Sequence, residues 1–102
     1  MNEQVLELVV YKIKKDQIKN FQQELLQHMR DLMKNMEGMI EYKTFSSVSE
    51  DGVFVDQVRW EDLECAELAS AKVKLLEKEE PFASIFGSFE EVKFFQHLKK
   101  VA

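Results

Sequence analysis

The chain has 102 residues, of which 45% are hydrophobic and 32% are charged, and its formal net charge is −5 at pH 7. This length suits a single domain over residues 1–102 with one modest hydrophobic core. An acidic chain has no basic field to hold a phosphate backbone, so we expect no nucleic-acid partner. One cysteine cannot form a disulfide within the chain, and no apolar run approaches the roughly 20 residues that span a bilayer. We therefore expect a cytoplasmic protein without a membrane partner.

The first third of the chain predicts a strand followed by a long helix. Residues 5–13 are rich in β-branched and aromatic residues and have the length of a strand. Asp16 is a good N-cap, and apolar residues then recur every three or four positions as far as Met36. Gly38 stands where a left-handed C-terminal cap is needed, so we expect the helix to end near Met36.

A hairpin is predicted next. Residues 39–47 and residues 53–60 alternate between apolar and polar side chains. The intervening turn contains Asp51-Gly52, a pair that supplies the positive φ angles of tight hairpins. These two segments should therefore pair as antiparallel strands.

The remainder of the chain predicts a second helix and a last strand. Asp62 is placed to cap the helix, and Pro81, the only proline, is placed to end it. A short helical turn around Phe82–Phe86 and a strand over residues 92–98 complete the order β-α-β-β-α-β. Right-handed crossovers applied to this order give an α+β, ferredoxin-like sandwich: a four-stranded antiparallel sheet in the order 4-1-3-2, with both helices on one face.

The sheet face that no helix covers predicts a partner. Leu6, Leu8 and Val10 lie on one side of the first strand, and Val9 and Tyr11 lie on the other. An antiparallel sheet with one wet face should not be apolar on both sides. A large leftover apolar face usually marks an interaction surface, so we expect a homodimer that packs sheet against sheet.

Three features of the sequence resemble the antibiotic biosynthesis monooxygenase-like family of dimeric α/β barrels. They are the Gly38-Met39 step into the second strand, the Ser49–Gly52 hairpin, and above all VRWEDLECA at residues 58–66. The resemblance runs from Val5 to Val101. It implies the fold and the homodimer, whereas the activity varies among cofactor-free oxygenases, heme-degrading enzymes and members without an assigned function.

The resemblance also narrows the implied activity. The heme-degrading branch carries an asparagine in the first strand and a tryptophan and a histidine on the second helix, and residues 5–13 and 63–80 contain none of these. Heme degradation is therefore disfavoured. The implied function is a monooxygenase that acts on a small aromatic or hydrophobic substrate without a cofactor, because an electron-rich phenolate can itself give an electron to oxygen. The alternative is a non-catalytic homodimer that binds a hydrophobic ligand or serves a stress-related role.

His97 and Arg59 are the catalytic candidates. Strand alternation is expected to place Glu7 and Arg59 on one face as cross-strand neighbours. This pair is either a structural ion pair at the dimer interface or a substrate-binding pair. His97 near the same end of the sheet is either an acid or base that works near neutral pH or a half-exposed strand residue.

The substrate-binding candidates are Trp60, Glu7, Phe82, Phe86 and His28. Trp60 either anchors the junction of strand and helix or lines a pocket, and Phe82 and Phe86 either fill the core or close over a cavity. His28 lies on the margin of the first helix's apolar stripe, at the surface or over a pocket. Two isolated histidines and one cysteine lack metal-ligand spacing, and three scattered glycines form no phosphate loop. We expect neither a metal nor a nucleotide cofactor.

Overall fold

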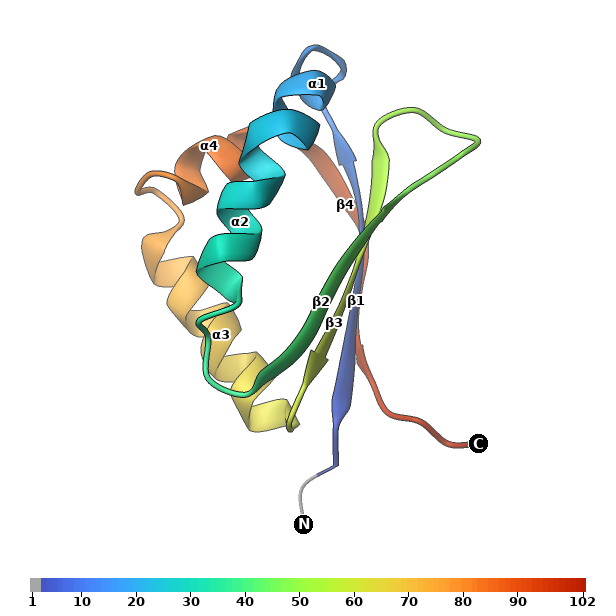
Figure 1. Cartoon of the computed structure of the whole chain (residues 1–102), viewed down its shortest axis with the longest axis vertical. Helices are drawn as coiled ribbons and strands as arrows, with labels where there is room; N and C mark the ends of the chain where they lie inside the picture. The colour runs from blue at the N-terminus through green and yellow to red at the C-terminus, as the bar shows by residue number, and fades with distance from the viewer. Residues whose placement is uncertain (1–2) are drawn as a thin grey trace.

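The computed structural model describes residues 3–102 and contains a four-stranded antiparallel sheet in the order β2-β3-β1-β4, with the helices on one face (Figure 1). This is the predicted order 4-1-3-2 read from the opposite edge, so the ferredoxin-like prediction is confirmed. The alternating, β-branched segments form the strands as expected. The four strands are β1 (Val5–Ile13), β2 (Met39–Ser46), β3 (Val53–Trp60) and β4 (Phe89–Leu98).

The first helical region is less regular than its periodicity predicts. Asp16 does not cap it but lies within an initial 3-10 turn, and no side chain caps the helical segments that follow. The helix ends at Met33 rather than Met36, because the backbone tightens into turns in which Met36 N–H donates to the Met33 carbonyl at 3.0 Å. The segments are a 3-10 turn (Lys15–Gln17), α1 (Ile18–Asn20), a π-helical turn (Phe21–Leu25) and α2 (Leu26–Met33).

Gly38 makes the turn from this helix into β2. Its φ is +81°, as the sequence predicts, and a Cβ there would lie 2.4 Å from Cys65 Sγ. Both the backbone conformation and the close approach therefore require glycine. The Gly38 carbonyl accepts the N–H of Glu61 at 2.8 Å, which ties the start of β2 to the end of β3.

The second helix, α3 (Leu63–Leu76), begins where the sequence predicts. The Asp62 carboxylate accepts the backbone N–H of Cys65 at 2.8 Å, which is an N-cap. α3 ends five residues before Pro81, which instead precedes the short α4 (Phe82–Gly87). The expectation that Pro81 ends α3 was therefore wrong.

The core fills the space between the helices and the sheet in two neighbouring clusters. The smaller cluster lies at the end of β3, where Trp60 is fully buried and the small side chains of Ala66 and Ala69 let α3 approach it closely. The larger cluster consists of Tyr11, Ile13, Phe21, Leu25, Met29, Phe54, Phe82 and Ile85.

The other face of the sheet is not covered by any described element (Figure 1). Partly exposed Leu6, Leu8 and Val10 of β1 lie there, as the sequence predicts. Phe45, opposite Val55, and Phe94, opposite Val10, flank them and are 51% and 42% exposed. This open face is therefore apolar along β1 and at Phe45 and Phe94, while Lys43 and Arg59 lie on the same face.

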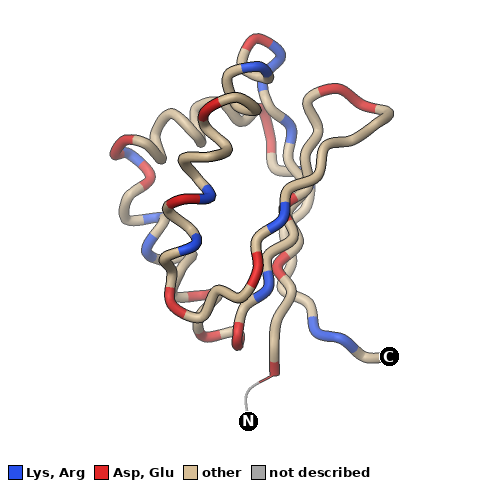
Figure 2. Tube along the Cα trace, viewed as in Figure 1, with Lys and Arg blue, Asp and Glu red and all other residues tan. Residues whose placement is uncertain are grey.

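Charged residues of both signs are spread over the helices and the sheet, with short runs such as Lys99-Lys100 near the C-terminus (Figure 2). Within residues 3–102, the helices are all too short or too polar to cross a lipid bilayer.

Candidate functional site

A cavity of about 210 Å³ lies between the sheet and the helices. Its apolar wall comes mainly from α2, α3, α4 and β4 and includes Met29, Val73 and Phe86. Three of its lining residues are exposed, Ser70 on α3 and Val92 and Phe95 on β4. The cavity therefore opens between α3 and the edge strand β4.

The sheet supplies the polar lining of this cavity, and Glu7 is one part of it. Glu7 is 7% exposed and lies on the helix-facing side of β1. His97 stands directly opposite it on β4, and its Nε2 lies 2.9 Å from Glu7 Oε1. Burial raises the pKa of the Glu7 carboxyl, and the interactions with His97 and with the indole of Trp60 partly offset that rise.

His97 does not line the cavity itself. It lines a second, solvent-open depression of about 600 Å³ at the end of the sheet, which we call the outer hollow. The Glu7–His97 pair therefore connects the cavity to a second opening at the end of the sheet. The charged or titratable residues around the outer hollow are Glu3, Asp62, Glu64, His97 and Lys99.

Asp56 is a second buried carboxylate at the cavity, and it is 6% exposed. Its Oδ1 accepts the hydroxyl hydrogens of Tyr11 at 2.8 Å and Thr44 at 2.9 Å, and its Oδ2 accepts that of Tyr42 at 2.7 Å. Burial raises the pKa of Asp56, while the three hydroxyl donors act to lower it. Both carboxylate oxygens are thus occupied.

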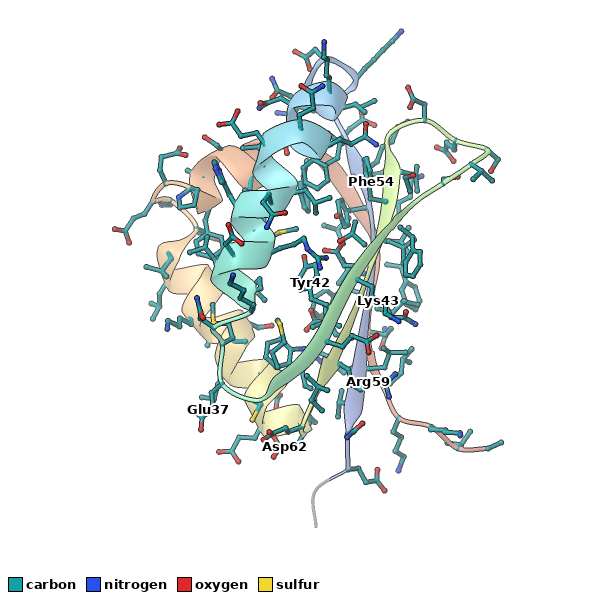
Figure 3. The ribbon with its side chains drawn as sticks, viewed as in Figure 1. Glu37, Tyr42, Lys43, Phe54, Arg59 and Asp62 are labelled. Carbon is teal, nitrogen blue, oxygen red and sulfur yellow. The ribbon has the colours of Figure 1, made fainter. Side chains whose placement is uncertain are left out.

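The two tyrosines of this network present oxygen atoms to the cavity. Burial, together with the nearby Asp56, raises the pKa of Tyr11 and of Tyr42, so both stay protonated. Since each donates its hydrogen to Asp56, its oxygen can only accept a further hydrogen bond. Tyr42 lies between α2 and the sheet, with the Arg30 guanidinium 5.3 Å from its ring centroid, whereas its neighbour Lys43 points to the other side (Figure 3).

Trp60 brings an unsatisfied donor to the same wall. Its side chain is fully buried and lines the cavity, and its Nε1–H makes no hydrogen bond with any residue that the structure describes. The indole is close enough to Glu7 to lower that carboxyl's pKa without the geometry of a hydrogen bond. Leaving a buried donor unpaired costs about 1–3 kcal/mol, and an acceptor on a ligand in the cavity would recover it.

The predicted neighbourhood of Glu7 and Arg59 is wrong. The register pairs Glu7 with Val58 and Arg59 with Leu6, so the two charged side chains lie on opposite faces of the sheet. Arg59 is exposed on the open face (Figure 3) and does not reach the cavity. The error is one of register: adjacent positions of a strand point to opposite faces, so an offset of one residue exchanges the faces.

Of the remaining candidates, Phe82 and Phe86 lie in the cavity lining and His28 lies outside it. Phe82 and Phe86 line the cavity with their rings stacked 5.9 Å apart, as the cavity interpretation of these residues requires. His28 is exposed on α2 and lies outside the cavity lining, so the interpretation as a surface residue holds. The next residue, Met29, is the one that points inward.

Sequence reasoning missed the Asp56 network. The available signal was an acid at an inward position of β3, between Phe54 and Val58 on an otherwise apolar side. A buried carboxylate needs donors, and Tyr11 and Tyr42 on the flanking strands supply them. Across residues 3–102 there is no group of three or more His, Cys, Asp or Glu side chains arranged to hold a metal ion.

Comparison with known proteins gives one family and one fold. The family model for antibiotic biosynthesis monooxygenase matches residues 5–72. A conserved protein from Methanosarcina mazei Go1 superposes with a TM-score of 0.76 at 12% identity, covering 97% of this chain and 94% of that one. A Bordetella bronchiseptica protein, provisionally named an antibiotic biosynthesis monooxygenase, gives a TM-score of 0.76 at 17% identity, covering 99% and 100%.

A third structure has an activity in its name. SnoaB, a cofactor-independent oxygenase from Streptomyces nogalater whose structure is that of a mutant, gives a TM-score of 0.71 at 14% identity, covering 98% of this chain and 93% of that one. At such identities the structural similarity shows the fold alone. No curated protein matches the chain.

Proposed function

Because the chain belongs to the antibiotic biosynthesis monooxygenase family, we propose that it is a cofactor-independent monooxygenase that oxidises a small hydroxylated aromatic compound. The observation that carries this proposal is the cavity, whose apolar wall faces a wall with the buried carboxylate of Glu7 and the unpaired N–H of Trp60. Substrate sites of this kind are apolar hollows with a few convergent polar groups. The name of SnoaB, a protein of the same fold, supports the reaction type.

The size and polarity of the cavity favour one substituted ring. A cavity of about 150 Å³ can hold benzene, so about 210 Å³ leaves room for a ring with a few substituents. Three of the polar groups, Glu7 and the oxygens of Tyr11 and Tyr42, accept hydrogen bonds, while the Trp60 N–H and the hydroxyl of Ser70 at the cavity opening can donate. A ligand with hydroxyl groups satisfies such a wall better than a ligand with carbonyl groups alone.

The chemistry requires only the substrate and oxygen. A phenol that loses its O–H proton becomes a phenolate, which gives one electron to O₂, and the two radicals combine to form a C–O bond. The peroxide takes up a proton, and loss of water with the hydrogen of the same ring carbon leaves a carbonyl group. One oxygen atom enters the quinone and the other enters water, so no external reductant is needed.

Oxygen consumption with single-ring hydroquinones and hydroxyphenols tests the proposal. We expect uptake of one O₂ per quinone formed, measured with an oxygen electrode and by quinone absorbance. The variant Val73→Trp fills the cavity and should abolish uptake, whereas Leu75→Trp, at an exposed position of the same helix, should leave it unchanged. Equal uptake by both variants would contradict a reaction in this cavity.

The competing function is a non-catalytic dimer that binds a hydrophobic ligand. A fully packed interior out of reach of Trp60 would favour that alternative, but Trp60 lines an open cavity and His97 reaches that cavity through Glu7. The chemistry of the lining therefore supports the enzyme. Ligand binding without oxygen uptake for any hydroxylated ring would favour the alternative.

We further propose that two chains associate through the open face of the sheet. Phe45 and Phe94 are half exposed there, and burial of such aromatic area is a strong driving force for association. Phe94→Asp should convert the dimer to a monomer in sedimentation at micromolar concentration. Leu75→Asp, an equally polar change at an exposed position on α3, is the control and should leave the dimer intact.

A further inference from the structure

The Glu7–His97 pair connects two spaces that are otherwise separate. Glu7 lines the cavity and His97 lines the outer hollow. The two side chains are in direct contact, with His97 Nε2 2.9 Å from Glu7 Oε1. The His97 ring is also fixed by an edge-to-face contact with Phe95, with 5.3 Å between centroids. A buried titratable group that lines the cavity and has a partner at the solvent is the arrangement that a proton path requires.

We propose that Glu7 and His97 form a proton relay, in which Glu7 takes the hydroxyl proton of the aromatic ligand and His97 carries it toward the outer hollow. This inference rests on the proposed function and adds the residues that generate the phenolate. Glu7 is the residue that touches the substrate, and His97 is a positioning residue that acts through Glu7.

The partners of the two buried acids explain why the relay involves Glu7 rather than Asp56. Both oxygens of Asp56 accept hydroxyl hydrogens, whereas within residues 3–102 the geometry gives Glu7 one hydrogen-bonded side chain, His97 at Oε1, with the Trp60 indole close by. Glu7 therefore has more capacity than Asp56 to accept a hydrogen bond from a ligand. Burial raises the pKa of Glu7, which favours a protonated carboxyl that can donate at one oxygen and accept at the other.

The groups that face Glu7 come from every strand of the sheet. They are His97 on β4, Asp56 and the Trp60 N–H on β3, and Tyr42 on β2. Asp56 disfavours a second negative charge in the cavity, so a phenolate needs a compensating positive charge close by. An imidazolium at His97 supplies that charge, and Trp60 offers the phenolate a donor.

The outer hollow gives His97 a route to solvent. Glu3, Asp62 and Glu64 line it together with a single cation, Lys99, so its charge is negative around His97. The side chain of His97 is 20% exposed and keeps access to water there. The relay thus runs from an apolar cavity to an acidic, wet surface.

Each proton in the step is accounted for. Before the step, the Glu7 carboxyl carries its proton on Oε1 and donates it to the unprotonated Nε2 of His97. The ligand O–H bond breaks as its proton moves to Oε2 of Glu7, while the Oε1 proton passes to Nε2. The result is a phenolate in the cavity, a Glu7 carboxyl protonated at Oε2 and a protonated His97, with no change of net charge or oxidation state. When the peroxide forms, the same proton returns through Glu7, and the pair regains its starting state.

The relay is tested with 4-nitrophenol, whose anion has its own absorbance band and which serves here only as a binding probe. In the wild-type protein we expect bound probe to show the anion band at a pH where free probe is neutral. Glu7→Gln keeps the shape and a hydrogen bond to His97 but has no base, so bound probe should lose the anion band. His97→Asn should retain a reduced band, and its pH midpoint should shift upward.

Imidazole rescue separates proton transfer from a structural role. His97→Ala leaves a gap beside the open outer hollow, and added imidazole should restore the anion band, which it cannot do for Glu7→Gln. Gln96→Ala, at an exposed neighbouring position of β4, is the matched control and should behave as wild type. Binding of the probe only as neutral phenol, or no binding at all, overturns the relay.

Measurements of oxygen uptake distinguish failure of the proton relay from failure of the proposed monooxygenase function. An anion band without oxygen uptake from any hydroquinone leaves the relay standing and refutes the monooxygenase. Unchanged uptake by Glu7→Gln refutes the relay and leaves the monooxygenase standing.

Discussion

Two buried carboxylates face one cavity, and they differ in what surrounds them. Asp56 is enclosed by three hydroxyl donors, while Glu7, among the described residues, is hydrogen-bonded to a partly exposed histidine and lies near the Trp60 indole. Burial raises the pKa of both groups, so the pKa direction alone does not separate their roles. The number of carboxylate oxygens that already accept hydrogen bonds separates the two roles. A carboxylate whose oxygens are all hydrogen-bonded holds strands together, and one with a remaining acceptor position can act on a ligand.

The largest expected effect is the loss of stability when Asp56, the fully hydrogen-bonded carboxylate, is removed. Asp56→Ala leaves the hydroxyls of Tyr11, Tyr42 and Thr44 without their acceptor, and at roughly 1 kcal/mol per hydrogen bond we expect the free energy of unfolding to fall by about 3 kcal/mol. Glu7→Ala removes one hydrogen bond from a histidine that can bond to water instead, and should cost about 1 kcal/mol. Urea denaturation of both variants measures the difference, and equal losses would mean that both acids are structural.

The sequence indicates the fold well, for physical reasons. Residues 5–13 and 53–60 form strands with the predicted bounds, because alternation and β-branched content are local properties that a sheet uses directly. Gly38 and Gly52 have positive φ angles, as their turns require. Asp51 does not, and residues 47–52 separate the two strands, so the hairpin forms as predicted but through a longer turn than the tight Asp-Gly one. The end of α2 was not predictable, since turns after Met33 fix it rather than the apolar repeat.

The candidate site could be predicted only where it does not depend on the register between neighbouring strands. Trp60, Phe82 and Phe86 line the cavity, which is one of the two interpretations that the sequence offers for each, because large aromatic side chains near an element boundary go inward whatever the register. The partner of Glu7 depends on which residue stands opposite it, and here that residue is His97 rather than Arg59. No local pattern contains this information.

A smaller effect is expected in the pH dependence of stability, and it tests the Glu7 side of the comparison between the two buried acids. The folded pKa of Glu7 lies above its ordinary value of 4.5, so the folded state binds this proton more tightly than the unfolded state. Glu7 therefore costs stability above the unfolded pKa, and that cost shrinks as the pH falls through the folded pKa to below 4.5. Relative to wild type, Glu7→Gln should be more stable at about pH 7 than at about pH 4.

The measurement is urea denaturation of wild type and Glu7→Gln at several pH values. The pH dependence of the difference between them, rather than its absolute size, reports the Glu7 proton. Glu90→Gln, which changes an exposed acid on β4, is the control and should show little such dependence. A difference that grows as the pH falls would contradict a raised pKa at Glu7.

The smallest expected effect concerns the donor beside these acids. Trp60→Phe removes an N–H that has no hydrogen-bond partner among the described residues, so the loss of stability comes from the smaller ring in the core and should stay below that of Asp56→Ala. If a ligand oxygen accepts this N–H, the affinity for a phenol should fall roughly three- to tenfold, as expected for one hydrogen bond. Calorimetry with phenol and with toluene separates the two contributions, because toluene has the ring without the acceptor. Weakened binding of phenol alone places the Trp60 N–H on the ligand beside Glu7, while equal weakening of both ligands reduces Trp60 to an apolar wall.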